Sequence, residues 1–245
     1  MEKGKNENGR KTSYLPPSKI ERIPSGIYGL DKLIDGGFVK NSSVMIRGDT
    51  GTCKTIFCLQ YLFRGASEYG DPGVFISFSE SRESILQHGR VLGWNLEELE
   101  KKEKFAVIRY EPHEVVSIMD EGGGSIRDEI ESIGAKRLVI DSLTAYAILF
   151  ENKYKANESV LNLFELLRKW NATTLVTSEF PVSLKRETGE RLGFLTDGII
   201  NLYYTRHNAH RARVLEIVKM RDTAHNDELN TFTLDKKGVR VKEGL

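Results

Sequence analysis

The chain has 245 residues, of which 39% are hydrophobic and 29% are charged, a balance typical of a folded globular protein. Its net charge of +1 argues against a general attraction to nucleic acid or to membranes, so such binding would need a local patch of charge. No apolar run approaches the ~20 residues that a membrane-spanning helix needs, and the polar amino terminus lacks the features of a signal peptide, so we expect a cytoplasmic protein without a membrane partner.

The first 18 residues differ in composition from the rest of the chain. Residues 1–18 are rich in Lys, Asn, Gly and Pro and have few apolar side chains, so we predict a disordered tail. The apolar segments all fall within 19–245, and a single hydrophobic core can serve up to ~250 residues. We therefore predict one domain over 19–245.

The most informative segment, 48–55, reads Gly-Asp-Thr-Gly-Thr-Cys-Lys-Thr. It matches the phosphate-binding pattern of Gly, four residues and Gly-Lys-Ser/Thr, except that Cys53 replaces the second glycine. Apolar residues at 43–47 and 56–63 predict a strand that enters this loop and a helix that leaves it. In such a loop, backbone N–H groups converge on the phosphates of a nucleotide, and the helix N-terminus adds its positive dipole end.

The same pattern assigns expected roles to single residues. Lys54 would neutralise charge on the β- and γ-phosphates of ATP, and the Thr55 hydroxyl would ligate Mg²⁺. The residues expected to bind the nucleotide are Gly48, Asp49, Thr50, Gly51, Thr52, Cys53, Lys54 and Thr55.

Cys53 has two possible interpretations. It is either a tolerated small residue that weakens phosphate binding somewhat, or an oxidisable thiol activated by Lys54 and by the helix N-terminus. We favour the first, because only exposed thiols with a lowered pKa react readily. Cys53 and Cys58 are five residues apart, so on the predicted helix they point to different faces and form neither a disulfide nor a metal-binding pair.

Short apolar strands alternate with helices along the first part of the chain. This alternation predicts right-handed βαβ units and a parallel sheet that helices cover on both faces. The expected strands are 43–47, 73–78, 105–109, 137–141 and 172–177, and the expected helices are 54–69, 82–93, 95–103, 125–133 and 157–170.

The pattern changes after residue 197, where strand-like runs follow one another without room for helices. This predicts an antiparallel extension of the sheet, with a turn at 235–238. The expected strands are 198–204, 212–220, 229–234 and 238–241.

Asp141 ends the apolar strand expected at 137–141. In phosphate-binding loop proteins, a carboxylate in this position holds Mg²⁺ directly or through water. The loop at 48–55 and Asp141 should meet, because parallel strands place both at the carboxyl edge of one sheet. The alternative is that Asp141 only caps a helix or a turn.

Several further motifs occur in a characteristic order. They are Ser25-Gly26-Ile27-Tyr28-Gly29-Leu30-Asp31-Lys32-Leu33 with Gly36-Gly37, the loop at 48–55, Pro72-Gly73-Val74-Phe75-Ile76-Ser77-Phe78, Gly93-Trp94, Ile140-Asp141-Ser142, and Glu216-Ile217-Val218-Lys219-Met220-Arg221-Asp222-Thr223-Ala224-His225. In these motifs the chain resembles the KaiC-like branch of the RecA-superfamily ATPases, from Ile23 to the C-terminus. The resemblance implies a RecA-like α/β fold, ATP and Mg²⁺, and nucleotide sites between the protomers of a ring, usually a hexamer.

The resemblance also implies roles for residues outside the loop. The family carries two adjacent glutamates after the second strand, one of which activates the attacking water; here Ser79 replaces the first and only Glu80 remains. Glu80 alone would position the water, so hydrolysis should be slow, unless Glu80 is merely an acidic residue at a helix N-terminus. Glu179 matches a position that senses the γ-phosphate.

Lys219 and Arg221 match basic residues that reach into the nucleotide site of a neighbouring protomer. Such residues offset the charge that develops on the γ-phosphate. They alternate with apolar residues in an expected strand and therefore project from one face. Without the resemblance, the same pattern would indicate a solvated sheet face.

Nucleic-acid binding is possible but not favoured. The candidate loops at 119–125 and 181–196 are acidic or of mixed charge and lack interleaved aromatic residues. The one basic cluster is expected at a hairpin tip and consists of Arg206, His207, His210, Arg211 and Arg213.

The sequence thus predicts a KaiC-like ring ATPase with slow hydrolysis. Two alternatives stay open: a scaffold whose assembly ATP controls with little turnover, and a recombinase-like ATPase that binds single-stranded DNA. No protein partner and no residue for self-phosphorylation is indicated.

Overall fold

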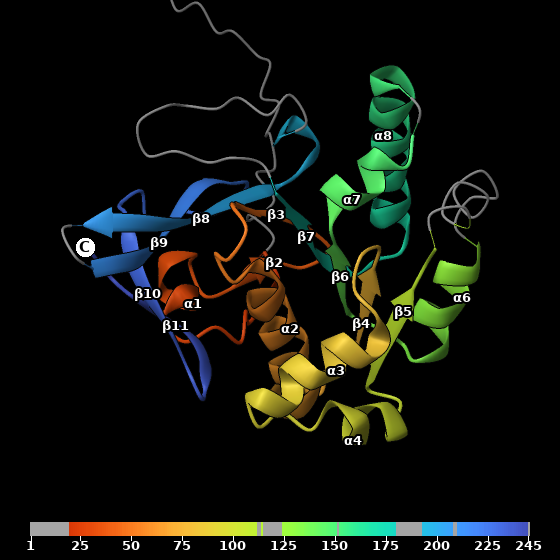
Figure 1. Ribbon diagram of the computed structural model, residues 1–245, viewed down its shortest axis with the longest axis horizontal. Helices are drawn as coiled ribbons and strands as arrows, with labels where there is room; N and C mark the ends of the chain where they lie inside the picture. Colours follow the sequence, from red (N-terminus) through yellow and green to blue (C-terminus); the bar gives the residue numbers. More distant parts are fainter. Residues whose placement is uncertain are drawn as a thin grey trace, which may run out of the picture.

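The computed structural model describes residues 20–111, 114, 124–150, 152–179, 193–207 and 210–244, and within these a mostly parallel sheet forms the centre of the molecule (Figure 1). In chain order its strands are β3 (Ser43–Gly48), β4 (Gly73–Ser77), β5 (Phe105–Arg109), β6 (Arg137–Asp141), β7 (Thr173–Ser178), β8 (Gly198–His207), β9 (His210–Met220), β10 (Asn230–Asp235) and β11 (Gly238–Lys242). Their order in space is β11-β10-β9-β8-β3-β7-β6-β4-β5.

The six strands from β8 to β5 in this order run parallel, whereas β9, β10 and β11 continue the sheet in antiparallel pairs. The predicted α/β fold with an antiparallel C-terminal extension is therefore confirmed. The predicted turn at 235–238 is also confirmed: the Lys237 N–H donates to the side chain of Asp235 over 2.7 Å, and Gly238 adopts a φ of 105°.

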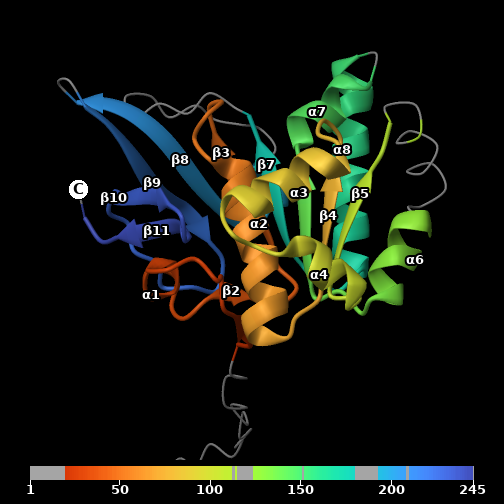
Figure 2. The same ribbon diagram turned by 60° about the horizontal axis from the view of Figure 1, so that its bottom comes forward.

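Helices cover both faces of the sheet, as Figure 2 shows, and each face has its own apolar core. The first core contains Val44 and Ile46 of β3, and the second contains Met45, because successive strand residues point to opposite faces. Helices α1 (Leu30–Leu33), α2 (Lys54–Arg64), α3 (Arg82–Val91) and α4 (Leu96–Lys101) contribute to the first core, and α6 (Gly124–Ser132), α7 (Leu143–Ile148) and α8 (Lys153–Lys169) to the second.

The helix expected over 54–69 is not one α-helix. It ends at Arg64 and continues as a π-helical turn, Gly65–Tyr69. Gly65 allows the buried Arg137 side chain to cross at close range, since a Cβ there would lie 2.3 Å from Cδ of Arg137. A tertiary contact thus decides where this helix ends.

Sequence reasoning missed five short elements: the two-stranded pair β1 (Arg22–Ile23) and β2 (Phe38–Val39), the helices α1 and α7, and a 3-10 helical turn, Gly193–Leu195. They have two to six residues, which is too short for a hydrophobic period to show.

The predicted tail at 1–18 lies outside the described residues, as do most of the candidate loops 119–125 and 181–196. No helix in the described ranges is long and apolar enough to cross a membrane.

A buried ion pair joins the start of β6 to the loop before β4. The guanidinium of Arg137 is fully buried and donates to Oδ2 of Asp71 from Nε, at 3.2 Å, and from Nη2, at 2.9 Å. It also donates to the Tyr61 carbonyl over 3.1 Å and lies 4.8 Å from the centre of the Tyr61 ring. Removal of one partner from such a pair leaves an uncompensated buried charge.

We therefore expect Asp71→Ala to lower the free energy of unfolding by about 3–5 kcal/mol, because Arg137 would stay buried without its counter-charge. Urea denaturation would measure the change. The matched control is Glu68→Ala, which removes the carboxylate of the more exposed Arg64–Glu68 pair and should cost about 1 kcal/mol or less. Equal losses in the two variants would contradict this account of the buried pair.

Candidate functional site

The segment 48–55 forms a loop between β3 and α2 at the carboxyl edge of the parallel strands. The register pairs Ser77 of β4 with Asp141 of β6, and Arg47 of β3 with Ser178 of β7, so these strands end side by side around the loop. Within the loop, the Lys54 ammonium donates to the carbonyls of Gly48, at 2.9 Å, and Asp49, at 3.1 Å. The Lys54 side chain thus folds back onto the loop that precedes the N-terminus of α2.

Burial lowers the pKa of Lys54, and the nearby Glu179, Asp141 and Asp49 act in the opposite direction. The ammonium is therefore held in a partly desolvated place with carboxylates on several sides. An anion such as a phosphate, placed there, would favour the charged form of this lysine.

Cys53 occupies a backbone conformation that favours glycine. Its φ of 75° and ψ of 26° lie in the left-handed region, directly before the first residue of α2. A residue with a Cβ is strained in that region by roughly 1–2 kcal/mol. The departure from the loop pattern therefore places a strained, half-buried side chain at the helix N-terminus.

Asp141 is the centre of a hydrogen-bond network that links three elements. Its Oδ2 accepts from the Thr55 hydroxyl over 2.7 Å, and its Oδ1 accepts from the Thr177 hydroxyl over 2.6 Å. Burial raises the pKa of Asp141, and the two hydrogen bonds oppose that shift. Thr55 and Asp141, predicted as metal ligands, thus meet as a hydroxyl beside a carboxylate, which is the hard-oxygen chemistry that Mg²⁺ prefers.

Glu80 lies in the connection between β4 and α3. Its backbone N–H donates to the Ser77 hydroxyl over 2.9 Å, and that hydroxyl donates to the Glu80 carbonyl over 2.8 Å. The Glu80 carboxylate contacts Ser84 and His88 of α3, and it lies close enough to contribute to the raised pKa of Asp141. Ser79, which stands at the position of the first of the two glutamates expected from the resemblance, is exposed.

Glu179 follows β7 directly and has an exposed side chain. Its N–H donates to the Thr144 hydroxyl of α7 over 2.9 Å, and its charge acts on Lys54. The structure therefore brings Glu179, Glu80 and Asp141 to the same edge of the sheet as the loop.

Lys219 and Arg221 lie elsewhere. The Lys219 ammonium donates to the carbonyls of Gly193, at 3.2 Å, and Thr196, at 2.5 Å, and Arg221 pairs with Asp197 over 3.1 Å. The Asp197 N–H bonds to the Ser43 carbonyl at the amino end of β3, whereas the loop follows its carboxyl end. These two basic residues thus sit toward the opposite edge of the sheet from their own loop.

Sequence reasoning missed the residues that hold these groups in place. Thr177 anchors Asp141, Ser84 and His88 contact Glu80, and Arg22 binds the segment after Arg221, through the Asp222 carbonyl at 2.7 Å and the Thr223 hydroxyl at 2.9 Å. Helical spacing offered a signal for Ser84 and His88, which follow Glu80 by four and eight residues. The partners of Arg22 are about 200 residues away in sequence, and no local pattern predicts them.

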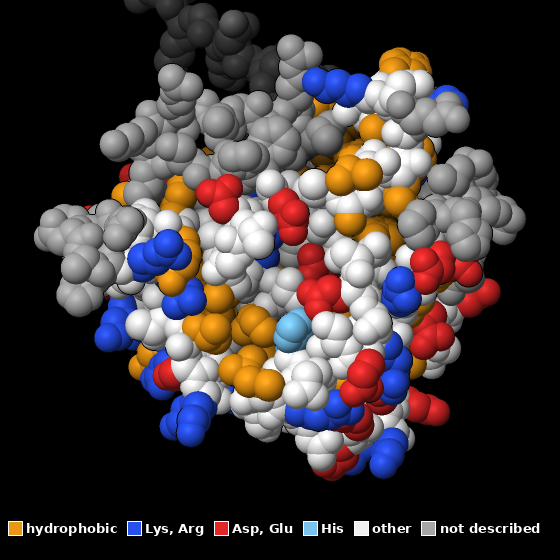
Figure 3. Space-filling model, in the orientation of Figure 1, with side chains coloured by type: hydrophobic (Ala, Val, Ile, Leu, Met, Phe, Trp, Pro, Cys, Tyr) orange, Lys and Arg blue, Asp and Glu red, His pale blue; other side chains and the backbone are white. Residues whose placement is uncertain are grey.

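The basic cluster lies on the hairpin of β8 and β9. In the backbone register of these strands, Arg206 is opposite Arg211 and His207 is opposite His210. The guanidinium carbons of Arg211 and Arg213 lie 5.1 and 4.9 Å from the centre of the Tyr204 ring. Among the described residues on the face drawn in Figure 3, side chains of both charge signs are interspersed.

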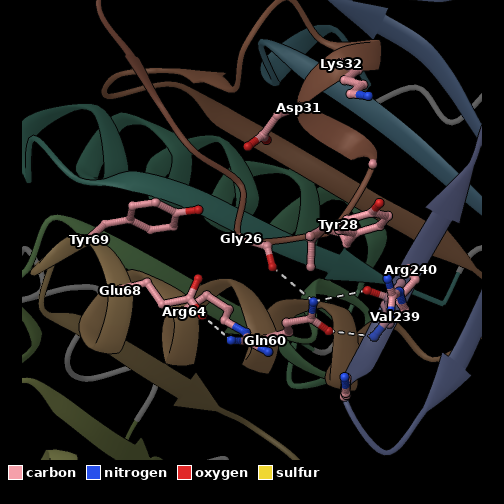
Figure 4. A pocket seen from close by; sticks show the side chains of 13 residues that line it. Gly26, Tyr28, Asp31, Lys32, Gln60, Arg64, Glu68, Tyr69, Val239 and Arg240 are labelled. Carbon is pink, nitrogen blue, oxygen red and sulfur yellow. Dashed lines mark hydrogen bonds and ion pairs between the residues drawn. The ribbon is translucent and has the colours of Figure 1, made fainter.

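A cavity of about 530 Å³ lies away from the loop, among the segment around Tyr28, the C-terminal half of α2 and the start of β11 (Figure 4). Gln60 closes one side of it and bonds the carbonyls of Gly26 and Val239. The Arg240 guanidinium lies over the Tyr28 ring at 4.4 Å. None of the residues predicted to bind nucleotide lines this cavity.

Comparison with known proteins settles the family. The family described as "ATPase: KaiC" matches residues 23–245. The chain belongs to the KaiC family of ATPase domains. The resemblance seen in the sequence motifs is thereby confirmed, and membership of this family supports ATP binding.

Individual relatives agree with this assignment. The chain is 31% identical to the circadian clock oscillator protein KaiC of Prochlorococcus marinus, over 91% of this chain and 46% of that protein. It is 29% identical to a UPF0273 protein of Methanocaldococcus jannaschii, over 91% of this chain and 96% of that protein. The crystal structure of a KaiC-like protein from Pyrococcus horikoshii has a TM-score of 0.82 and 35% identity, and the match covers 91% of this chain and 100% of that one. The KaiC-like chain thus spans about half the length of the cyanobacterial KaiC protein, since the match covers 46% of that protein.

We expect Cys53→Gly to stabilise the KaiC-like fold by about 1 kcal/mol and to tighten ATP binding, because glycine adopts the observed φ without strain. Thermal unfolding and equilibrium titration with ATP would measure both effects. Cys53→Ala is the matched control, since it removes the thiol but keeps the Cβ. If Ala and Gly tighten binding equally, the thiol rather than the backbone strain is responsible.

Proposed function

We propose that the chain is a slow, Mg²⁺-dependent ATPase whose nucleotide sites lie between the protomers of a cytoplasmic ring, with six protomers as the expected number. The observation that carries this proposal is the contact between the Thr55 hydroxyl and the Asp141 carboxylate, 2.7 Å apart, beside the N-terminus of α2 and Lys54. It brings together, at one sheet edge, the two groups of residues that a nucleotide site needs, those for phosphate and those for the metal ion.

The residues of the loop supply the binding. The backbone N–H groups of Gly48, Asp49, Thr50, Gly51, Thr52 and Cys53 surround the phosphates, together with the dipole of α2. Lys54 leaves its carbonyl partners to neutralise the terminal phosphates. Thr55 and Asp141 hold Mg²⁺, whose charge offsets that of the phosphates when it is bound.

Glu80 positions the attacking water, and Glu179 senses the γ-phosphate. Hydrolysis is slow because only Glu80 remains of the two adjacent glutamates that the family carries, and the exposed Ser79 cannot act as a base near neutral pH without help. The strain at Cys53 weakens phosphate binding in addition.

Lys219 and Arg221 act in trans in this proposal. Their position toward the amino edge of the sheet keeps them from their own loop, and it leaves Arg221, which is half exposed, accessible to a neighbour. A site completed by a second copy requires a homo-oligomer, and a head-to-tail ring gives every loop such a neighbour.

A second candidate function is a scaffold whose assembly ATP controls with little turnover. The observations that favour it are Ser79 and the strained Cys53, which both reduce hydrolysis without removing the metal-binding pair Thr55 and Asp141. A recombinase-like role, in which Tyr204, Arg211 and Arg213 stack on single-stranded DNA, is the least supported, because this platform is short and holds a single aromatic ring.

Phosphate release by the wild type and by Lys54→Ala tests the site. We expect a slow wild-type rate and a loss of about 10²-fold or more in the variant, since the cation that stabilises the transferred phosphate is removed. Lys169→Ala, an exposed lysine at the end of α8, is the control and should match the wild type. Equal rates for Lys54→Ala and wild type would exclude this loop as the hydrolytic site, and ATP binding with no release would favour the scaffold.

Mixed rings test the contribution in trans. We expect Lys54→Ala and Arg221→Ala each to be inactive alone, but equal mixing should restore roughly a quarter of wild-type activity, because that share of the sites joins an intact loop to an intact Arg221. Phosphate release after disassembly and reassembly of the mixture would measure it. Normal hydrolysis by Arg221→Ala alone would refute the role of this residue.

A further inference from the structure

The carboxylate of Glu80 is held from one side only. Its Oε2 accepts from the Ser84 hydroxyl over 2.5 Å and lies 2.9 Å from Nε2 of His88, while no contact to Oε1 occurs among the described residues. The backbone of Glu80 is fixed on both its N–H and its carbonyl by the Ser77 hydroxyl. The residue therefore offers one uncommitted oxygen at the carboxyl edge of the sheet, close to Asp141.

The sequence of α3 explains this arrangement. Ser84 and His88 are four residues apart and so lie on one face of the helix, which Ser81 begins as the N-cap by accepting from the Ser84 N–H. This face is directed at Glu80, whereas several other charged groups in and near α3 that the structure describes pair with one another. Arg82 pairs with Glu100, Arg90 with Glu83 and Glu97, and Arg109 of the adjacent β5 with Glu111.

Within the described part of the chain, the charged group found in contact with His88 is Glu80. Histidine is the side chain whose ordinary titration falls between pH 5 and 8. An ionised carboxylate at this distance accepts a hydrogen bond from Nε2 when that nitrogen carries the hydrogen, as it does in one tautomer of the neutral ring and always in the protonated ring, which adds a full positive charge. That charge stabilises the carboxylate, weakens it as an acceptor from water, and holds it against α3.

We propose that His88 is a positioning residue for Glu80 that makes ATP hydrolysis sensitive to pH. Neutral His88 orients the carboxylate through one hydrogen bond and leaves Glu80 free to accept from the attacking water. Protonated His88 restrains Glu80 as an ion pair and slows the chemical step. The inference rests on the proposed role of Glu80 in hydrolysis, and it adds that acidification lowers the rate through this pair.

The test compares kcat of the wild type and of His88→Gln between pH 5.5 and 8. Glutamine offers a neutral donor of similar reach that does not titrate. We expect the ratio of the H88Q rate to the wild-type rate to be about fivefold higher at pH 5.5 than at pH 8. An effect of this size corresponds to the strength of a partly exposed ion pair. Titrations of other groups, such as Asp141 and Lys54, affect both proteins and cancel in this ratio.

Ser84→Ala is the matched variant. It removes the second hydrogen bond to the same oxygen without a titrating group, so we expect a lower kcat but a pH dependence like that of the wild type. Thermal unfolding of each variant separates loss of fold from loss of positioning. A constant ratio of H88Q to wild type across this pH range would overturn the inference.

Glu80→Gln distinguishes failure of this inference from failure of the proposed function. If E80Q hydrolyses ATP as fast as the wild type, Glu80 does not position water and the proposed function loses that step, together with the inference. If E80Q is slow while the ratio of H88Q to wild type stays constant with pH, only the role of His88 is refuted. If E80Q is slow and the ratio changes as stated, both are supported.

Discussion

The carboxylate of Asp141 is the group on which the geometry of the candidate site depends. One oxygen accepts from Thr55 at the start of α2 and the other from Thr177 in β7, while its own strand β6 lies between β4 and β7. The candidate loop is therefore fixed to the sheet through a buried carboxyl group rather than by apolar packing alone. Burial raises the pKa of this carboxyl, and the two hydroxyl groups compensate part of the cost of its desolvation.

Around Asp141, some residues of the candidate site match the pattern expected of a nucleotide site and others depart from it. Thr55 and Asp141, the proposed metal ligands, are in contact, and Lys54 lies within the loop, but Cys53 carries backbone strain and Ser79 provides no carboxylate. Both departures concern catalysis and phosphate approach, not the framework. In the proposed ring, binding therefore survives while turnover is reduced, and Glu80 with its contacts to Ser84 and His88 becomes the place where the rate is set.

Much of this fold was predictable, because each strand of a parallel sheet is a short apolar run that can be recognised from its own residues. The strands β5 and β6 were predicted to the residue, and the loop, Asp141 and Glu179 follow from their places at strand ends. Errors occurred where tertiary contacts override local preference. The helix predicted to reach residue 69 changes to a π-helical turn at Gly65, where Arg137 crosses it, and α7 is too short to leave a periodic signal.

The class of fold, the family and the candidate loop at 48–55 could be predicted from the sequence, since they depend on residue type and spacing along one segment at a time. What surrounds each candidate group became known from the folded chain. It placed Thr177 on Asp141, set His88 against Glu80, and put Lys219 and Arg221 toward the sheet edge opposite their own loop. Such contacts join residues from separate strands and helices, and the order in which strands lie in a sheet is fixed by packing of the whole core rather than by any local pattern.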